Sequence, residues 1–328
     1  MSDVQFQLQC LSERDLGPIW ANHFRQIWPH CKVWYLSEGL LRRPRYSTCL
    51  EALETYLPEL EPVYHHLVDL VGGSDLAARF LSLYDPPPYM AGCSQAVWTD
   101  SELFLVKNYD YSPDLFEKTL FFSQWLKPVI GMLDCTWGLL DGMNGDGLVA
   151  SLTFGGKKKI GEGFGAPLIL RYLLETCSST AEAMIKISKI PCHMAYNVTI
   201  LDASGAFVQA FLAPDTPAVF CEDPVTTNHQ LEADWPEYAA FSKTKERHQF
   251  LTQHLHTPGT QAEPFIGQFL KPPLYNLNFK HQFGTLYTAV YRPEEQALEL
   301  RFPNHKIHQN FQDFQVGKTD IYIQEVPT

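Results

Sequence analysis

The stretch PPPYMAGCSQAVWT, residues 86–99, separates two parts of the chain with different sequence patterns. Its three prolines fix φ and bias preceding residues away from helix, which predicts an extended connector. Apolar residues near helical spacing predict that residues 1–86 are mostly helical. At Cys93 an apolar run begins that is typical of a strand. The stretch therefore predicts a helical segment followed by a region rich in β-structure.

Beyond the connector, strands and helices come in groups rather than in strict alternation. Residues 93–111 predict two strands around the turn Thr99–Ser101, and residues 119–154 predict further strands. We expect turns at Asp141-Gly142 and at Asn144-Gly145. The other predicted elements are a helix over 165–177, a helix capped by Ser179 with Glu182, hairpins over 197–213 and 284–302, and helix near 236–256. This grouping favours an α+β class with antiparallel sheet and segregated helices.

The composition excludes several classes of function. The 328 residues, 45% hydrophobic and 19% charged, suit one large domain or two ordinary ones. A net charge of −12 argues against nucleic-acid binding, which needs a dense basic surface. No apolar run reaches the roughly 18–20 residues of a membrane span, and the first residues lack the apolar core of a signal peptide. We therefore expect a cytoplasmic protein without membrane insertion.

Neither a metal nor a cofactor is indicated by the motifs. The eight cysteines are scattered without a CxxC pair, and the twelve histidines lack partners at ligand spacing. The glycine-rich GEGFGAP, residues 161–167, does not have GxGxxG spacing, and GGKKK, residues 155–159, does not have P-loop spacing. We expect no cofactor, and most cysteines to be small buried apolar residues in a reducing compartment.

The Gly92–Cys93 step carries the first candidate chemistry. If this peptide bond were cut, Cys93 would hold a thiol and a free α-amine on one residue. An α-amine has a pKa of about 7.7–8.0 and a thiol about 8.5, so the amine could act as the base for its own side chain. Gly92 tolerates the strained backbone that an attack by the thiol on the preceding carbonyl requires.

Three polar residues further along the chain could complete this chemistry. Asp110, in KNYDY, could orient the new amine, and Asn228, in VTTNHQ, could stabilise an oxyanion, a donor whose loss typically costs about 10²–10³ in rate. Arg247, in FSKTKERHQF, could clamp Asp110 or lower the pKa of the thiol. His229, beside Asn228, leaves open a thiol enzyme that needs no cleavage.

Six motifs in this order resemble the acyl-coenzyme A:6-aminopenicillanic acid acyltransferase family, which is related to penicillin V acylases, bile salt hydrolases and acid ceramidase. They are AGCSQAV, VKNYDY, DGMNGDGLVASLTF, GFGAPLILRYLLETCSSTAEAM, NVTILDASG and VTTNHQ, and the resemblance spans residues 85–300. It implies the N-terminal-nucleophile hydrolase fold, an αββα sandwich of two antiparallel sheets between helical layers. It also implies self-cleavage into a helical pro-region, residues 1–92, and a catalytic domain, residues 93–328.

Residue by residue, the resemblance implies roles for five side chains. Cys93 would be the nucleophile and, through its freed amine, the base. Asp110 matches the aspartate that contacts the amine, and Asn228 matches the oxyanion asparagine. Arg247 corresponds to a downstream arginine, and Asn144 to a pocket residue near the oxyanion.

The chain also departs from the family pattern. Lys107 stands where the hydrolase relatives often have arginine, and lysine lacks the planar bidentate fork, so the surroundings of the amine should differ. Ser94 replaces a frequent threonine and keeps the hydroxyl. We expect an apolar acyl pocket, with Phe164, Trp137 and Phe154 as candidate lining residues.

The sequence therefore predicts a self-processing cysteine amidohydrolase that acts on linear acyl amides through a thioester on Cys93. An acyltransferase that moves an acyl group from a thioester or an amide to an amine is an alternative, although no coenzyme A signature is present. An uncleaved, non-catalytic homologue is another. The expected partner is a small acyl amide and not a nucleic acid. An αβ heterodimer would follow from cleavage, and a homo-oligomer stays open.

Overall fold

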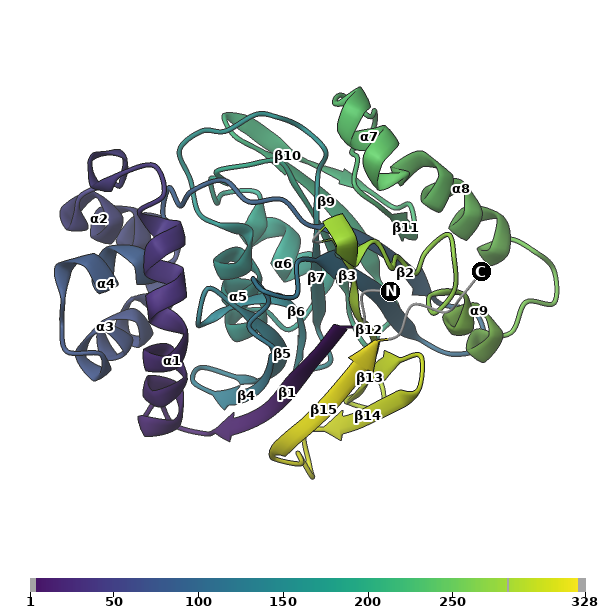
Figure 1. The fold of residues 1–328 in the computed structure, drawn as a ribbon, viewed down its shortest axis with the longest axis horizontal. Helices are drawn as coiled ribbons and strands as arrows, with labels where there is room; N and C mark the ends of the chain where they lie inside the picture. The colour runs from purple at the N-terminus through teal and green to yellow at the C-terminus, as the bar shows by residue number, and fades with distance from the viewer. Residues whose placement is uncertain (1–3, 282, 324–328) are drawn as a thin grey trace.

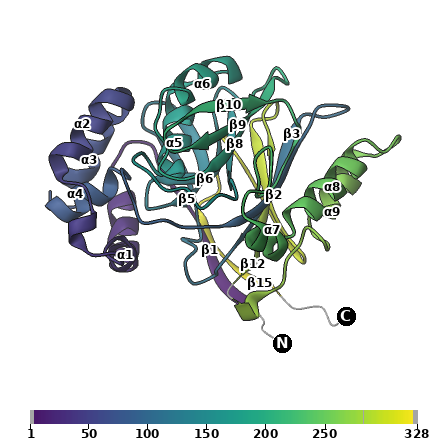
Figure 2. The same ribbon diagram turned by 90° about the horizontal axis from the view of Figure 1, so that it is seen from above.

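The computed structural model describes residues 4–281 and 283–323, and its centre is a pair of stacked sheets (Figures 1 and 2). The nine-stranded sheet has the order β10 (Thr216–Cys221), β9 (Phe207–Ala213), β8 (Tyr196–Leu201), β7 (Val149–Phe154), β6 (Gly138–Asn144), β5 (Pro128–Asp134), β4 (Thr119–Gln124), β1 (Val4–Glu13) and β15 (Gly317–Ile323). The six-stranded sheet has the order β11 (Val225–Thr226), β2 (Gly92–Trp98), β3 (Phe104–Tyr111), β12 (Gly284–Arg292), β13 (Ala297–Phe302) and β14 (His305–Asn310).

Helices cover the outer face of each sheet. Two helices, α5 (Ala166–Thr176) and α6 (Thr180–Ile187), lie on the nine-stranded sheet. Outside them lie the N-terminal helices α1 (Pro18–Tyr35), α2 (Tyr46–Tyr56), α3 (Glu61–Leu70) and α4 (Asp75–Leu81) (Figure 2). The six-stranded sheet is covered by α7 (Pro236–Ser242), α8 (Thr244–Leu255) and α9 (Ala262–Gln268). Short 3₁₀ turns lie at Leu40–Arg42, Pro58–Leu60 and Phe279–His281.

The apolar residues explain this layering. One buried cluster joins the N-terminal helices, α5 and the outer face of the nine-stranded sheet; a second lies between the sheets; a third lies under α8 and α9. Helix α5 has ten buried residues in eleven because it is packed on both sides. The expected α+β class, with two mainly antiparallel sheets between helical layers, is confirmed. The one parallel pair among the strands described is β1 with β4.

The N-terminal segment differs from its predicted helical character at its start. Helices α1 to α4 are present, but residues 4–13 form β1, which pairs with β15 on one side and β4 on the other. The sequence VQFQLQC alternates apolar and polar residues, and its apolar side chains Phe6, Leu8 and Cys10 are buried. Residues 4–13 are thus held inside the nine-stranded sheet by both neighbours.

Two local predictions are corrected. Asp141-Gly142 lies within β6 and is not a turn; the reversal before β6 is instead at Cys135 and Thr136, both with left-handed φ. At α6, Ser179 Oγ accepts from the Glu182 N–H at 3.3 Å, as predicted, but the Glu182 carboxylate bonds the N–H of Ser178 rather than of Ser179. The predicted turn after Asn144, the helix over 165–177 and both hairpins are confirmed. No helix in the described ranges is long and apolar enough to cross a membrane.

Candidate functional site

The pairing of β2 with β3 determines what surrounds Cys93. Gly92 lies opposite Asp110 and Cys93 opposite Tyr109 in this antiparallel pair. Cys93 is fully buried. A Cβ at Gly92 would lie 2.4 Å from the Phe283 ring and 3.1 Å from Asp110 Cβ, so these two side chains leave no space for a third. The register thus places the predicted carboxylate against the predicted cleavage site.

Asn228 and Arg247 converge on the backbone of Cys93. Asn228 follows β11, which pairs with β2, and its Oδ1 accepts from the Cys93 N–H at 2.9 Å. Arg247, on α8, donates from Nη1 to the Cys93 carbonyl at 2.7 Å and to Ser94 Oγ at 2.6 Å. Its Nη2 donates to Asn228 Oδ1 at 2.7 Å. Both predicted residues therefore bind Cys93, the predicted nucleophile, directly, although 135 and 154 positions separate them from it in sequence.

The amide nitrogen of Asn228 points at the segment just before Cys93. It donates to the carbonyls of Ala91 at 3.3 Å and Phe154 at 3.2 Å. The Tyr238 hydroxyl, on α7, donates to the same Ala91 carbonyl at 3.0 Å. Two hydrogen-bond donors thus bind the carbonyl of Ala91, the residue that precedes Gly92. The sequence prediction did not include Tyr238, since it lies in an expected helix and belongs to none of the motifs.

Asp110 is held as a buried carboxyl. Thr285 Oγ1 donates to its Oδ1 at 2.7 Å, and Arg247 Nη1 lies 3.6 Å from its Oδ2. Burial raises the pKa of Asp110, and the charge of Arg247 counteracts part of that rise. Burial also raises the pKa of the Cys93 thiol to about 12, against the opposing effect of Lys107. In the uncut chain the thiol is therefore protonated at neutral pH, and its attack requires a proton acceptor.

Lys107, on β3 of the six-stranded sheet, pairs with Asp141, on β6 of the nine-stranded sheet. Its Nζ lies 2.9 Å from Asp141 Oδ2 and donates to the Leu140 carbonyl at 2.7 Å, with all three groups buried. The Asp141 carboxylate also accepts from the hydroxyls of Tyr287 and Tyr291, each at 2.6 Å. This network explains why lysine suits the position: a single point charge reaches one carboxylate across the sheets. Asp141, Tyr287 and Tyr291 were not predicted.

Asn144 and Phe164 make their hydrogen bonds and ring contacts, among the described residues, with partners other than Cys93, Asp110, Asn228 and Arg247. Asn144 donates to the carbonyls of Leu174 at 2.9 Å and Cys177 at 2.8 Å, while its Oδ1 accepts from the N–H groups of the following loop. It caps the end of α5 and shapes a turn. Phe164 packs edge-on against Tyr84 at 5.1 Å, in the core under the N-terminal helices.

The other two aromatic candidates also belong to the core. Trp137 donates from Nε1 to the Leu81 carbonyl, and Phe154 packs edge-on against Tyr238 at 5.1 Å. Phe154 is the one of these aromatics that touches the site, since its carbonyl accepts from Asn228.

His229 has partners other than the thiol. Its Nδ1 lies 2.9 Å from Thr244 Oγ1 and 3.1 Å from Thr227 Oγ1, and its ring packs against His248. Burial, followed by the charge of His248, lowers its pKa to about 4. These contacts give no support to a Cys93–His229 pair.

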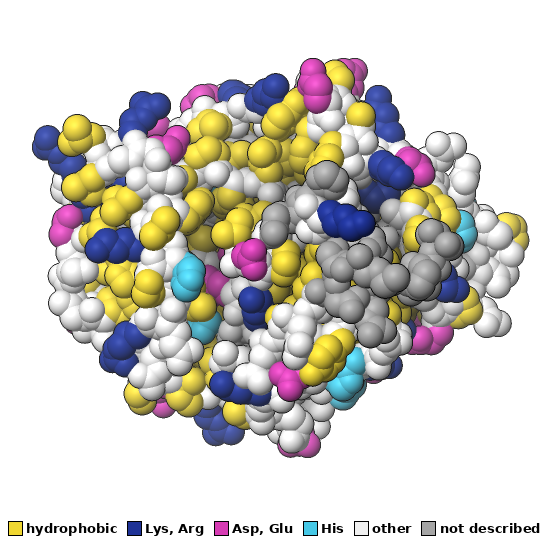
Figure 3. All heavy atoms as spheres, viewed as in Figure 1, with side chains coloured by type: hydrophobic (Ala, Val, Ile, Leu, Met, Phe, Trp, Pro, Cys, Tyr) yellow, Lys and Arg dark blue, Asp and Glu magenta, His cyan; other side chains and the backbone are white. Residues whose placement is uncertain are grey.

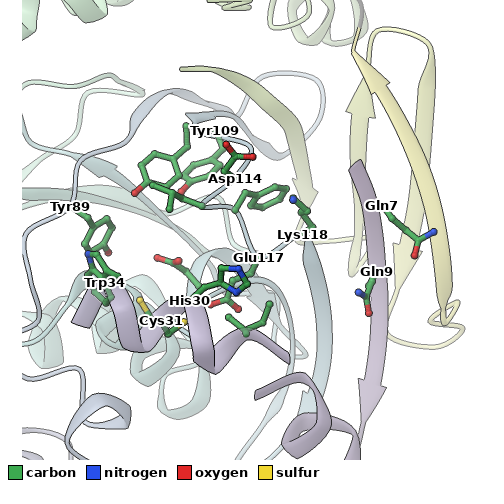
Figure 4. A pocket seen from close by; sticks show the side chains of 16 residues that line it. Gln7, Gln9, His30, Cys31, Trp34, Tyr89, Tyr109, Asp114, Glu117 and Lys118 are labelled. Carbon is green, nitrogen blue, oxygen red and sulfur yellow. The ribbon is translucent and has the colours of Figure 1, made fainter. Parts of the chain in front are cut away.

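A cavity of about 330 Å³ lies next to this site, between α1, β1, β3 and the end of β5 (Figure 4). Tyr109, which faces Cys93 across β2 and β3, forms part of its wall. The lining residues are Gln7, Gln9, Ile27, His30, Cys31, Trp34, Tyr89, Tyr109, Tyr111, Asp114, Leu115, Phe116, Glu117, Lys118, Asp134 and Cys135. In the space-filling view, apolar, acidic, basic and histidine side chains surround a hollow on this face (Figure 3).

The sequence profile of the acyl-coenzyme A:6-aminopenicillanic acid acyl-transferase family matches residues 97–306. The chain belongs to this family. The match includes Asp110, Asn228 and Arg247 and begins four residues after Cys93. Membership confirms the expected relationship, and with it an enzyme of the amide hydrolase and acyltransferase type.

Solved structures give weaker likenesses. Penicillin V acylase from Agrobacterium tumefaciens is similar at 12% identity and a TM-score of 0.47, over 70% of this chain and 90% of that chain. A mutant of conjugated bile acid hydrolase from Clostridium perfringens is similar at 14% identity and a TM-score of 0.40, over 72% and 97%. A comparison with curated proteins gives no match.

Proposed function

We propose that the protein is a self-processing cysteine amidohydrolase that cuts its own Gly92–Cys93 bond and then hydrolyses linear acyl amides through a thioester on Cys93. The observation that carries this proposal is the convergence of Asn228, Arg247 and Asp110 on the Gly92–Cys93 step. Each binds the backbone or lies opposite it, which is the arrangement that a backbone-directed reaction needs.

Self-cleavage proceeds by transfer of the Gly92 acyl group from nitrogen to sulfur. Cys93 Sγ bonds to the Gly92 carbonyl carbon, the C–N bond breaks, and the thiol proton passes to the departing amine nitrogen. Water then attacks the thioester, which gives the Gly92 carboxylate and restores the thiol. Arg247 and Asn228 fix the carbonyl and the nitrogen of Cys93 throughout, so the nucleophile does not have to be repositioned.

In the processed enzyme the freed α-amine takes the role of base. It stays beside Asn228 Oδ1 and near Asp110, and it accepts the thiol proton. The thiolate attacks the acyl carbonyl of the substrate, and the ammonium then gives its proton to the leaving amine. The Asn228 amide and the Tyr238 hydroxyl, which bind the Ala91 carbonyl before cleavage, are the donors available to an oxyanion. Water releases the acyl group.

An acyltransferase is the second candidate, and the family description favours it. It differs in one step, since an amine rather than water attacks the thioester. Product analysis with added amine separates the two: hydrolysis gives free acid, and transfer gives a new amide.

We further propose that the two chains stay together after cleavage and that the enzyme works in the cytoplasm. Residues 4–13 lie between β4 and β15, and α1 lines the cavity beside the site, so the segment before Cys93 is built into the catalytic part. All eight cysteines are free, which supports a reducing compartment.

The test is an intact-mass spectrum of the purified wild type and of Cys93→Ala, with Cys221→Ala as a matched control because this half-buried cysteine lies on β10, away from the site. We expect two chains, split before Cys93, from the wild type and the control, and one chain from Cys93→Ala. A full-length wild type would overturn the proposal and favour the uncleaved, non-catalytic homologue.

A further inference from the structure

The walls of the cavity beside Cys93 are largely aromatic. Trp34, on α1, packs edge-on against Tyr89, in the connector before β2, with ring centroids 6.0 Å apart. Tyr109 and Tyr111, on β3, lie 5.7 Å apart, and all four residues line the cavity. Figure 4 shows Trp34 and His30 reaching from α1 towards the side that carries Tyr109 and Asp114. Electron-rich ring faces of this kind attract organic cations.

The charged groups of the cavity are mainly negative. Asp114, Glu117 and Asp134 line it, against Lys118 as its one lysine or arginine. Glu117 is already engaged, since its Oε1 accepts from the Thr136 N–H at 2.8 Å and its Oε2 lies 3.1 Å from His23. Asp134, at the end of β5, has no ion-pair partner among the described residues. Asp134 is half-buried and Cys135 donates to its carboxylate, but no ion pair among the described residues balances its charge, which favours a ligand that brings a positive charge.

A second polar group in the wall is also without a partner. The Tyr89 hydroxyl is buried and makes no hydrogen bond among the described residues. This hydroxyl is closed off from the cavity, so Tyr89 contributes to the wall through its ring, which packs against Trp34. The ring adds a further electron-rich surface for a cation.

We propose that this cavity binds an ammonium group, so that the substrates are linear amides that carry a positively charged nitrogen away from the amide bond. The inference deepens the function proposed above and rests on it, because the wall residue Tyr109 lies opposite the nucleophile residue. Aromatic faces and the Asp134 carboxylate attract the cation together. The same carboxylates repel amides that end in a carboxylate or a sulfonate.

The test uses matched amides and wild-type processed enzyme. In the first set, a hexanoyl group is joined to putrescine, to pentylamine as the neutral isostere, or to 5-aminopentanoate. In the second set, 6-aminohexanoyl and heptanoyl butylamides place the ammonium on the acyl side. We expect kcat/KM for the cationic member of one set to exceed its neutral isostere by about tenfold or more, and the anionic amide to be the poorest. Equal or better turnover of the neutral amides, or preference for the anion, would overturn the inference while leaving the amidohydrolase intact.

Two variants and a binding measurement sharpen the test. Asp134→Asn should reduce the ratio of cationic to neutral kcat/KM towards one, and Asp114→Asn, at the exposed rim, should reduce it less. Asp313→Asn, an exposed acid away from the cavity, should leave the ratio and the activity unchanged. Uncleaved Cys93→Ala should be stabilised against heat by tetramethylammonium chloride more than by sodium chloride. If no amide is turned over but this stabilisation is seen, the cation site stands and the proposed function fails; if the two salts act alike, the cation site fails.

Discussion

The residues around Cys93 and the wall of the neighbouring cavity differ in whether their polar side chains have partners within the protein. Around Cys93, the Arg247 guanidinium and the Asn228 amide bond each other and the backbone of residues 91–93. The Asp110 carboxylate accepts from Thr285 and lies 3.6 Å from Arg247. In the cavity, the Asp134 carboxyl has no ion-pair partner among the described residues. The first arrangement is complete without a ligand and suits a reaction on the chain itself. The second is incomplete, as a binding site for another molecule is before it is filled.

The largest predicted loss of stability comes from removing Arg247. Arg247→Leu leaves the Asp110 carboxylate and the Asn228 oxygen without their buried cation. We expect a loss of about 3–5 kcal/mol in the free energy of unfolding, because an uncompensated buried charge is strongly destabilising. Urea denaturation in the Cys93→Ala background measures this loss apart from any effect of processing.

Arg25→Leu is the matched control for this variant, since Arg25 is exposed on α1. We expect its unfolding free energy to change by no more than about 0.5 kcal/mol. Equal losses in the two variants would show that the buried network contributes nothing specific.

A smaller effect is expected from filling the close approach at Gly92. In Gly92→Ala, the new Cβ would lie 2.4 Å from the Phe283 ring, so the ring or the strand must move. We expect a loss of about 1–3 kcal/mol from overpacking and slower self-cleavage, because the carbonyl shifts away from the thiol. The measurement is the half-time of cleavage by intact mass, together with thermal stability.

A double variant shows whether the ring causes this effect. Phe283→Ala should restore part of the cleavage rate in the Gly92→Ala background, and Gly317→Ala should be neutral because nothing lies within 4 Å of its added Cβ. Cleavage of Gly92→Ala at the wild-type rate would contradict the assigned role of the close approach.

Much of the fold follows from local pattern. The hairpins and α5 were predictable because alternation, helical spacing and turn residues act within a few positions. The same signal is present in VQFQLQC, whose alternation marks β1, although the stronger helical pattern that follows favours helix for the segment as a whole. By contrast, Asp141-Gly142 has the composition of a turn and is a buried strand, because Asp141 pairs with Lys107 on the other sheet. The sequence around Asp141 does not indicate that its partner lies on a different sheet.

The site was predictable only in part, for the same reason. Spacing alone does not join Cys93 to Asn228 or Arg247; the resemblance of motifs to a family selected them, and their contacts with Cys93 agree with that selection. The same resemblance assigned Asn144 to the pocket, whereas its contacts among the described residues are those of a turn residue. Tyr238 and the Asp134 cavity belong to no quoted motif, and they become visible only when α1, α7 and the two sheets are packed together.

The smallest predicted effect concerns Asp134 and the dependence of stability on pH. Burial, followed by the nearby Glu117, raises the pKa of Asp134 from 3.8 to about 7, so the folded state holds this proton more tightly than the unfolded state does. Its contribution to stability is complete below pH 4 and is lost as the pH rises through about 7. Asp134→Asn cannot ionise and avoids that loss. We expect its melting temperature relative to wild type to be about 2–4 °C higher at pH 8.5 than at pH 5, measured without ligand. Asp313→Asn should show no such difference between the two pH values. If the melting temperature of Asp134→Asn differed from wild type by the same amount at both pH values, burial would not raise the pKa of Asp134. The contrast between the cavity and the residues around Cys93 would then be lost.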